Sequence, residues 1–399
     1  MKLRSTETFW PIKNAMDTSY PSIDADITVP ILIIGGGITG ALIAYKLITE
    51  GKKVVLVDKR DICNGSTAAS TALLQYEIDI SLHELIEKRG FDCAVSSYKN
   101  CEKAIYNLNK IVDSIKSDCQ FEFKKSIYFC SLKKDIPFLE REFKTRKENG
   151  FKVKWLEETD LKKLGLNGYA AIESEAGAVM DPYRLAHDLL KYCKQKGMQI
   201  FDRTNIIEFK HQKGKILALS ENNFTITAED IIHCSGYEST ETLTEKIVDL
   251  KSTYALASES FTEIPKAFKN AIYWNTSKPY SYFRGTADNR IIMGGGDDEF
   301  QNPERRDKSL HTKEAYLLKQ FQKCFPDINL KLDYSWAGTF GETQDALPYL
   351  GKPNPKKKEH YVLGFGGNGI TFSVMAMDSI IASLNNSDHP DLKFYKFNR

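Results

Sequence analysis

The residues best suited to chemistry in this sequence are a glycine-rich turn and an aspartate that follows it. The turn, Gly35-Gly36-Gly37-Ile38-Thr39-Gly40, comes after a continuously apolar run and before an apolar helical stretch. The first glycine permits a tight turn, the second lets a pyrophosphate approach the backbone, and the third lets the helix pack on the strand. The helix N-terminus favours phosphate through its free N–H groups and its dipole. Asp58 ends the next strand, where it can accept hydrogen bonds from ribose hydroxyls, so the set predicts a dinucleotide site.

A second glycine triplet provides a comparison. Gly294-Gly295-Gly296 is followed by Asp297, Asp298 and Glu299, and no apolar helix comes after it. Three carboxylates repel phosphate, so this segment is predicted to be a simple turn.

The segment after Asp58 predicts an extended ligand. Residues 59–79, KRDICNGSTAASTALLQYEID, are rich in small and hydroxylated side chains that can pass close to a ligand and donate hydrogen bonds to its phosphates. The strand ending in IIHCSG offers a second close backbone approach at its glycine. The cofactor contacts predicted here are Asp58, Lys59, Arg60, Gly65, Ser66, Thr67 and Gly236.

A third glycine-rich segment decides between a nicotinamide and a flavin. In residues 361–384, YVLGFGGNGITFSVMAMDSIIASL, a strand meets several glycines and then a helix that is apolar nearly all round. Reduction leaves negative charge near N1 and the C2 carbonyl of a flavin, and a helix N-terminus stabilises charge there. A nicotinamide dehydrogenase has no use for a second helix start of this kind, so the pattern favours flavin. The predicted contacts are Gly366, Gly367, Asn368, Gly369, Ile370 and Thr371.

The ordered set of motifs resembles the D-amino acid oxidase family of FAD-dependent oxidoreductases, which includes glycine oxidase, sarcosine oxidase and γ-glutamylputrescine oxidase. The resemblance runs from about residue 27 to residue 385, through ILIIGGGITGALIA, the GSTAAST loop, IIHCSG, YFRGTADNRIIMGGG, TQDALPYLG and GFGGNGITFS. The N-terminal TFWPIKNAMDTSYPSIDAD is closest in style to the γ-glutamylputrescine oxidase branch.

This resemblance implies an α/β (α+β, two-domain) flavoprotein. A Rossmann-like FAD-binding domain would be joined to a substrate domain built on an antiparallel sheet flanked by helices, and this sheet would roof the flavin. We place the FAD-binding domain in the discontinuous segments 1–82, 177–240 and 335–399, and the substrate or cap domain in 83–176 and 241–334.

The resemblance also implies oxidation of a C–N bond in an amine or amino acid. Hydride would pass from the carbon beside a neutral amine to flavin N5, and the imine would then hydrolyse. Some relatives tether FAD through a cysteine just before a T-x-D segment, where this chain has Gly338, and others through a histidine after G-S-T, where it has Ala68 and Ala69. We therefore predict noncovalent FAD, with Gly338 among its contacts. Thr371 stands where sarcosine oxidases carry a lysine, which argues against a carboxylate contact there.

An amino-acid substrate would need a cation for its carboxylate, ideally a bidentate arginine. Arg284 is the first candidate, because it lies beside aromatic residues on the presumed roof strand; Tyr282 would point to the same face, and Tyr254 is a further candidate. The alternative is a structural ion pair for the arginine and core or edge positions for the tyrosines. The histidines have no metal-ligand spacing, so no metal site is predicted.

Composition limits the remaining possibilities. A chain of 399 residues suggests two domains, and 42% hydrophobic with 27% charged residues is typical of a globular protein. A net charge of +2 gives no reason to expect nucleic acid or an anionic membrane. The 8 cysteines are scattered, as in a reducing compartment, and no run reaches the roughly 18 apolar residues of a membrane span. We therefore expect a cytoplasmic location.

The elements that must position these residues follow from periodicity and end signals. Residues 1–26 are expected to form an irregular arm over the surface. The predicted regular elements are a strand at 27–34, a helix at 38–49, a strand at 53–58, a helix carrying an apolar stripe at 104–115, and a helix between Asp181 and Gly197.

Two other functions stay open on the sequence alone. One is a flavin dehydrogenase that acts on the C–O bond of a hydroxy acid or glycerol phosphate. The other is a non-catalytic flavin-binding subunit of a complex. The sequence does not choose among small-molecule amines, between oxygen and another electron acceptor, or among oligomeric states.

Overall fold

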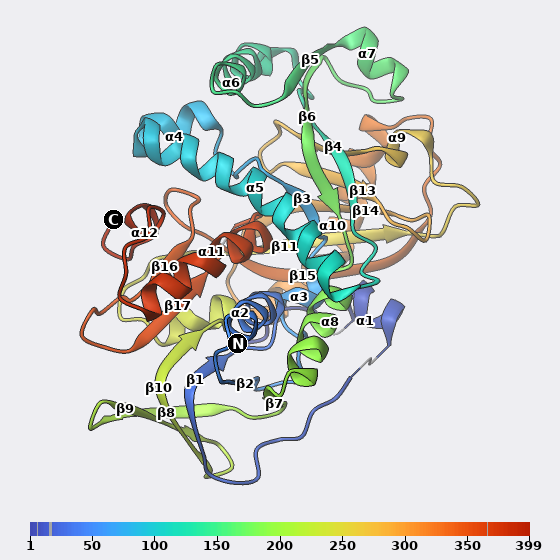
Figure 1. Ribbon diagram of the computed structural model, residues 1–399. Helices are drawn as coiled ribbons and strands as arrows, with labels where there is room; N and C mark the ends of the chain where they lie inside the picture. Colours follow the sequence, from blue (N-terminus) through green and yellow to red (C-terminus); the bar gives the residue numbers. More distant parts are fainter. Residues whose placement is uncertain (6, 16–17, 365) are drawn as a thin grey trace.

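The computed structural model describes residues 1–5, 7–15, 18–364 and 366–399, and it contains two β-sheets with helices packed around them (Figure 1). The first sheet has the strand order β16-β17-β10-β1-β2-β7, and β9 pairs with both β10 and β8. Its strands are β1 (Ile27–Ile34), β2 (Val54–Val57), β7 (Gln199–Phe201), β8 (Ile206–Gln212), β9 (Lys215–Ser220), β10 (Thr225–His233), β16 (Tyr349–Gly351) and β17 (Glu359–Leu363).

Strand β1 is central because it is apolar on both faces. Leu32 and Ile33 are both 0% exposed, as is typical of a parallel strand that is covered on both sides. Ile33 pairs with Ile232 of β10 and with Leu56 of β2, and both neighbours run parallel to β1. This is the Rossmann-like arrangement that the sequence predicts.

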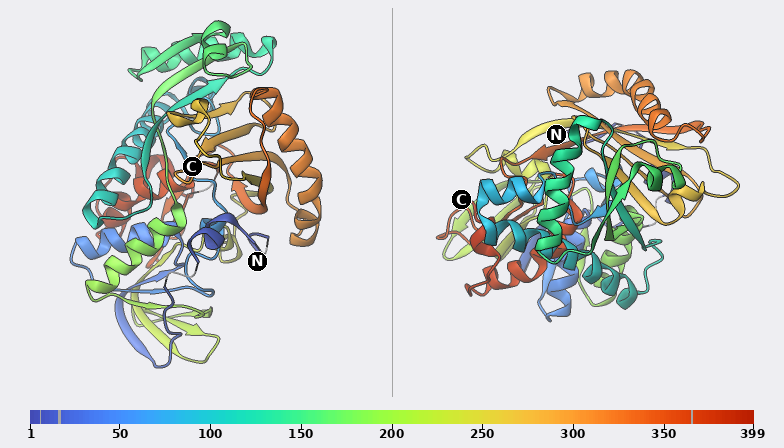
Figure 2. Two further views of the ribbon diagram at one scale, coloured as in Figure 1. Left: turned by 90° about the vertical axis from the view of Figure 1, so that its right-hand side faces the viewer. Right: turned by 90° about the horizontal axis from the view of Figure 1, so that it is seen from above.

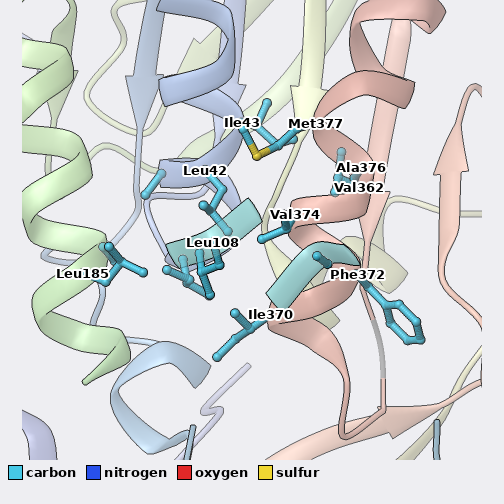
Figure 3. Close-up of a cluster of buried hydrophobic side chains, with 14 of the residues drawn as sticks. Leu42, Ile43, Leu108, Leu185, Val362, Ile370, Phe372, Val374, Ala376 and Met377 are labelled. Atoms are coloured by element: carbon cyan, nitrogen blue, oxygen red, sulfur yellow. The ribbon is translucent and has the colours of Figure 1, made fainter. Parts of the chain in front are cut away.

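Four helices pack together on one side of this sheet: α2 (Ile38–Thr49) and α11 (Gly369–Leu384) lie on its strands, and α5 (Phe91–Ile115) and α8 (Pro182–Gln195) pack against these two helices. Figure 3 shows how their apolar side chains meet, with Ile43 of α2, Leu108 of α5, Leu185 of α8 and Val374 of α11 in one cluster. The predicted limits of α2 are confirmed. The Asp181 side chain accepts a hydrogen bond from Arg184 N at 2.9 Å and thereby caps α8, as its sequence predicts.

The second sheet is mostly antiparallel and has the order β15-β11-β14-β13-β12-β4-β6-β3, with β5 paired to β6. Helix α10 (Pro303–Cys324) packs on β11, β14 and β15, where Leu317 and Phe321 of the helix join Phe283 in a second core. The strands are β3 (Leu73–Gln75), β4 (Glu122–Phe129), β5 (Val153–Glu157), β6 (Ala170–Val179), β11 (Asp249–Ser258), β12 (Ala271–Asn275), β13 (Ser281–Gly285), β14 (Ile291–Glu299) and β15 (Leu332–Glu342).

The remaining helices are short or peripheral: α1 (Phe9–Asn14), α3 (Ser66–Ala69), α4 (Leu82–Arg89), α6 (Ile136–Glu148), α7 (Glu158–Lys163), α9 (Lys266–Lys269), α12 (Leu392–Tyr395) and the 3-10 segments η1 (Lys133–Asp135) and η2 (Gly236–Glu241). Figures 1 and 2 place α6 and α7 at one end of an elongated molecule and the β8–β9 hairpin at the other. Within the described part of the chain, no helix has the length and apolar character needed to cross a membrane.

The segment at 294–296 is not the predicted turn. It lies within β14, which pairs with β11 on one side and β13 on the other. Gly294 lies under the Tyr282 ring, because a Cβ at this glycine would be 2.2 Å from the tyrosine Oη. Gly295 and Gly296 have φ values of +128° and +68°, beside an irregularity in the pairing with β11. The glycines therefore allow a strand to bend under an aromatic ring.

The N-terminal segment is also not the predicted surface arm. Phe9 and Trp10 are each 1% exposed, and the Trp10 indole donates a hydrogen bond to Ser70 O at 2.6 Å. Arg4 forms a β-bridge with Gly338 at the edge of β15. Residues 6 and 16–17 of the predicted arm lie outside the described residues. Burial of these two aromatic side chains holds the segment against the rest of the protein, although many of its other residues are polar.

Two predicted domain boundaries fall inside strands. Strand β6 crosses residue 177, and β15 crosses residue 335, so both strands belong to the second sheet on either side of the expected boundary. Strand β3, placed by sequence in the first domain, also pairs with β6. The second sheet thus takes its strands partly from segments that adjoin the glycine-rich loops.

Candidate active site

A cavity of about 370 Å³ lies between the two sheets. On one side it is lined by the C-terminal ends of β1, β2 and β10, which is where parallel α/β sheets bind ligands. On the other side it is lined by the inward-facing side chains of β11, β13 and β14. The two sheets therefore enclose one continuous space that extends from the glycine turn to the second sheet.

The glycine turn has the close packing that its sequence predicts. A Cβ at Gly35 would lie 2.5 Å from Cys234 O, and one at Gly40 would lie 1.9 Å from Gly35 O. Gly35 also has a φ of +108°, which favours glycine. Gly35, Gly37, Ile38 and Thr39 line the cavity, whereas Gly40 lies behind it and lets α2 approach β1.

Asp58 lies at the end of β2 and faces the cavity. Its carboxylate accepts hydrogen bonds from Gly36 N at 2.7 Å and Arg60 N at 2.8 Å. Burial raises the pKa of Asp58 to about 6, although both backbone hydrogen bonds oppose this shift. A carboxylate has about four lone-pair sites, so Asp58 keeps acceptor capacity for ribose hydroxyls.

The cations after Asp58 are held by an acid. Lys59 Nζ lies 2.8 Å and Arg60 Nη2 lies 2.7 Å from Glu238 Oε1. Burial of Glu238 acts to raise its pKa, but the hydrogen bonds from Arg60 and Lys59 lower it to about 2. These pairs fix the loop against η2, and both cations line the cavity together with Gly65, Ser66, Thr67 and Gly236.

The N-terminus of α11 closes another part of the cavity. Asn368 donates to Gln75 O at 3.2 Å and to Glu77 O at 2.9 Å, so the glycine segment is fastened to the end of β3. Thr39 of α2 and Ser373 of α11 share a hydrogen bond of 2.8 Å. All the contacts predicted in this segment line the cavity: Gly366, Gly367, Asn368, Gly369, Ile370 and Thr371.

Arg284 is not available as the carboxylate-binding cation that the sequence predicts. Its side chain is 2% exposed, and Nη1 donates to the carbonyl oxygens of Thr71, Ala72 and Met180 at 3.0, 2.7 and 2.8 Å. Burial lowers its pKa to about 10. The guanidinium therefore holds together three backbone segments, and Arg284 does not line the cavity.

The two tyrosines that the sequence predicts for the substrate site lie in different environments. Tyr282 lines the cavity, but Tyr254 is 1% exposed in the second core and lies on the opposite face of β11. Its neighbour Thr253 faces the cavity instead. Successive residues of a strand point to opposite faces of the sheet. If β11 is assigned the wrong face, Tyr254 is expected in the cavity and Thr253 in the core, which is the reverse of their positions in the structure.

Sequence reasoning missed two acids and a tyrosine. Asp79, Asp297 and Tyr280 line the cavity close to Tyr282. Tyr280 precedes Tyr282 by two positions, a spacing that could have revealed it. The sequence predicts a turn for Asp297 and its neighbours, and Asp79 lies in the loop between β3 and α4, where no strand pattern marks its direction.

The sequence matches the model of the DAO family, described as FAD dependent oxidoreductase, over residues 30–379. The chain belongs to the DAO family of FAD-dependent oxidoreductases. It is 24% identical to the putative Rieske 2Fe-2S iron-sulfur protein YhfW of Bacillus subtilis, over 96% of this chain and 74% of that protein. It is 22% identical to γ-glutamylputrescine oxidoreductase of Escherichia coli, over 92% of this chain and 86% of that protein. The structure of glycine oxidase from Geobacillus kaustophilus matches with a TM-score of 0.81 and 17% identity, covering 94% and 99% of the two chains.

The cavity of this FAD-dependent oxidoreductase fits its cofactor. The glycine turn has no Cβ that would separate the α2 N-terminus from a pyrophosphate. Asp58 offers an acceptor where a ribose would lie, and the α11 N-terminus faces the same space. Among the described residues, no group of three or more His, Cys, Asp or Glu side chains is arranged to hold a metal ion.

Proposed function

We propose that this flavoenzyme oxidises the C–N bond of a small amine or amino acid. The observation that carries the proposal is the continuity of the cavity, which joins the glycine turn to side chains of the second sheet. A substrate that contacts Tyr280, Tyr282 and Thr253 shares one cavity with the cofactor. The names of two relatives, γ-glutamylputrescine oxidoreductase and glycine oxidase, support a nitrogen-containing substrate.

The chemistry divides between the cofactor and the protein. Bound FAD supplies the two-electron acceptor. The amine loses a hydride and a proton to become an imine, and water converts the imine to a carbonyl compound and a released amine or ammonia. The protein orients the carbon and nitrogen atoms of the substrate within the cavity.

Noncovalent retention of FAD is part of this proposal. Gly338 lies at the cavity with Ala69, whose Cβ would be 3.6 Å from a Cβ at the glycine. Neither residue has a nucleophilic side chain. Oxygen or another electron acceptor would complete the reaction, and we propose the cytoplasm as its location.

The test begins with the absorption spectrum of the purified protein before and after acid precipitation. Flavin that moves to the supernatant as FAD supports noncovalent binding, and flavin that stays in the pellet contradicts it. An anaerobic titration with amines, amino acids, hydroxy acids and glycerol phosphate then follows loss of the oxidised flavin bands. Bleaching by a nitrogen compound with release of a carbonyl product supports C–N oxidation. Bleaching by a hydroxy compound alone supports C–O oxidation, and no bleaching by any donor supports a non-catalytic subunit.

A further inference from the structure

We infer that Asp79 and Asp297 select the substrate by positive charge, so that this enzyme oxidises a cationic amine with a second ammonium group, such as a linear diamine or polyamine. This inference rests on the proposed C–N oxidation and names its substrate class. It replaces the carboxylate recognition that was expected of Arg284.

Two carboxylates face the same part of the cavity. Asp79 Oδ2 accepts a hydrogen bond from Gly367 N at 2.6 Å, and Asp79 Oδ1 accepts one from the Tyr280 hydroxyl at 3.1 Å. Asp297 projects from β14 into the same cavity. Its Oδ1 is buried and has no hydrogen-bond partner among the described residues. A buried acceptor of this kind is unfavourable unless a donor binds to it.

Among the described residues that line the cavity, no cation pairs with either carboxylate. Among the described lining residues, the lysines and arginines are Lys59 and Arg60, and both are paired with Glu238 near Asp58. Lys313 lies outside the lining, where its Nζ contacts Asp298 Oδ2 at 2.8 Å and Gly296 O at 2.6 Å. A substrate carboxylate would therefore meet two acids with no cation beside them in the described lining, whereas an ammonium group would meet two acceptors.

The electrostatics of the pair agree with this geometry. Burial, together with the nearby charges of Asp79 and Glu342, raises the pKa of Asp297 to about 7, while Thr253 and the charge of Lys313 oppose the shift. Burial also raises the pKa of Asp79, against hydrogen bonds from Gly367 and Tyr280. A bound ammonium group stabilises both ionised carboxylates, so cation binding and carboxylate ionisation favour each other.

The test compares three probes of equal chain length on the FAD-loaded full chain under anaerobic conditions. They are 1,4-diaminobutane, 1-aminobutane and 4-aminobutanoate, and binding is measured by calorimetry. We expect the diamine to bind at least about tenfold more tightly than the amino acid, which corresponds to about 1.4 kcal/mol. Diamine affinity should also increase as the pH rises from 6 to 8, because Asp297 ionises in this range. Equal or tighter binding of the amino acid would overturn the inference.

Two substitutions make the test specific. Asp297→Asn and Asp79→Asn should each weaken diamine binding by about tenfold or more while FAD content stays unchanged. Glu299→Gln is the matched control, because this acid lies two positions along β14 but outside the cavity lining. If both Asn variants bind the diamine as the parent does, the inference fails. If either variant loses FAD or does not fold, the parent protein alone tests the inference. The two measurements are then the relative affinities of the three probes and the change in diamine affinity with pH.

The inference and the proposed function can fail separately. Diamine binding that depends on Asp297, without flavin reduction by any amine, would contradict C–N oxidation but retain charge selection. Flavin reduction by amino acids without diamine binding would retain C–N oxidation and refute charge selection.

Discussion

At the residue scale, the identity of a side chain predicts its chemistry only when its direction is known. Arg284 and Tyr282 both lie on β13, yet the arginine binds carbonyl oxygens behind the cavity while the tyrosine lines it. Asp297 shows the opposite case, since an acid for which the sequence predicts a turn projects into the cavity. Its environment gives a prediction that can be tested without substrate or cofactor.

The Asp297→Asn variant should gain stability relative to the parent as the pH rises. The pKa of Asp297 is about 7 in the folded protein, above its ordinary value of 3.8. Between these values the folded state binds more protons than the unfolded state, so this group's contribution to the free energy of unfolding becomes less favourable from about pH 4 to pH 7. Denaturant unfolding of the cofactor-free protein at pH 5 and pH 8 measures this difference. Parallel pH profiles for the variant and parent would contradict it.

At the scale of elements, a buried charge network joins α6 to α4 and to the end of β3. Arg146 Nε lies 2.6 Å from Glu142 Oε1, and Arg146 Nη1 lies 3.1 Å from Glu77 Oε1. All three side chains are 0% exposed. Glu142 also accepts hydrogen bonds from Leu82 N and His83 N at the start of α4. The network therefore supplies acceptors for backbone N–H groups at the N-terminus of α4 and fixes the position of α6.

Arg146→Met should destabilise the protein by about 3–5 kcal/mol, because it leaves two buried carboxylates without a cation. Arg141→Met is the matched control in the same helix. Arg141 pairs with Glu87 at the surface, where both side chains are about 60% exposed, so its loss should cost less than about 1 kcal/mol. Chemical denaturation of both variants at pH 7 gives the comparison. Equal losses in the two variants would show that the buried network has no special role.

The same network predicts acid sensitivity. Burial of Glu142 acts to raise its pKa, but the charge of Arg146 and the hydrogen bond from His83 lower the pKa to about 2. The stability gained from Glu142 is therefore present above its ordinary value of 4.5 and is lost as the pH falls toward 2. The slope of unfolding free energy against pH in this interval should be smaller in Glu142→Gln than in the parent. An unchanged slope would exclude Glu142 as its source.

At the scale of the whole molecule, the N-terminal segment joins the α3 loop to the second sheet beside the cavity. Ser5 N donates to Ala337 O at 2.9 Å and Thr339 N donates to Leu3 O at 2.8 Å, which adds the segment to the edge of β15. Trp10 then reaches Ser70, at the end of α3, and its ring lies 5.7 Å from the Arg284 guanidinium. The segment thus holds the α3 loop against the second sheet.

Trp10→Ala should cost about 3–5 kcal/mol of stability, because a large buried side chain is removed. It should also weaken FAD binding, since Trp10 supports the loop that contains Ser66 and Thr67. Ile12→Ala is the control, because Ile12 belongs to the same helix but is 46% exposed. Denaturation midpoints and FAD titration of both variants measure the two effects. Loss of stability with unchanged FAD affinity would separate the segment from the cofactor site.

The sequence alone determined the dinucleotide turn, the order of the glycine-rich segments and the flavin family, because these depend on local backbone geometry and on spacing along the chain. Gly35 and Gly40, for example, must be glycine wherever the second sheet lies. Tertiary structure alone decided which side chains face the cavity. Strand direction places Thr253 inside and Tyr254 outside, and packing buries Phe9 and Trp10 despite their polar neighbours. The proposed substrate class depends on the tertiary structure, because the contact between Asp79 and Gly367 joins residues that are far apart in the chain.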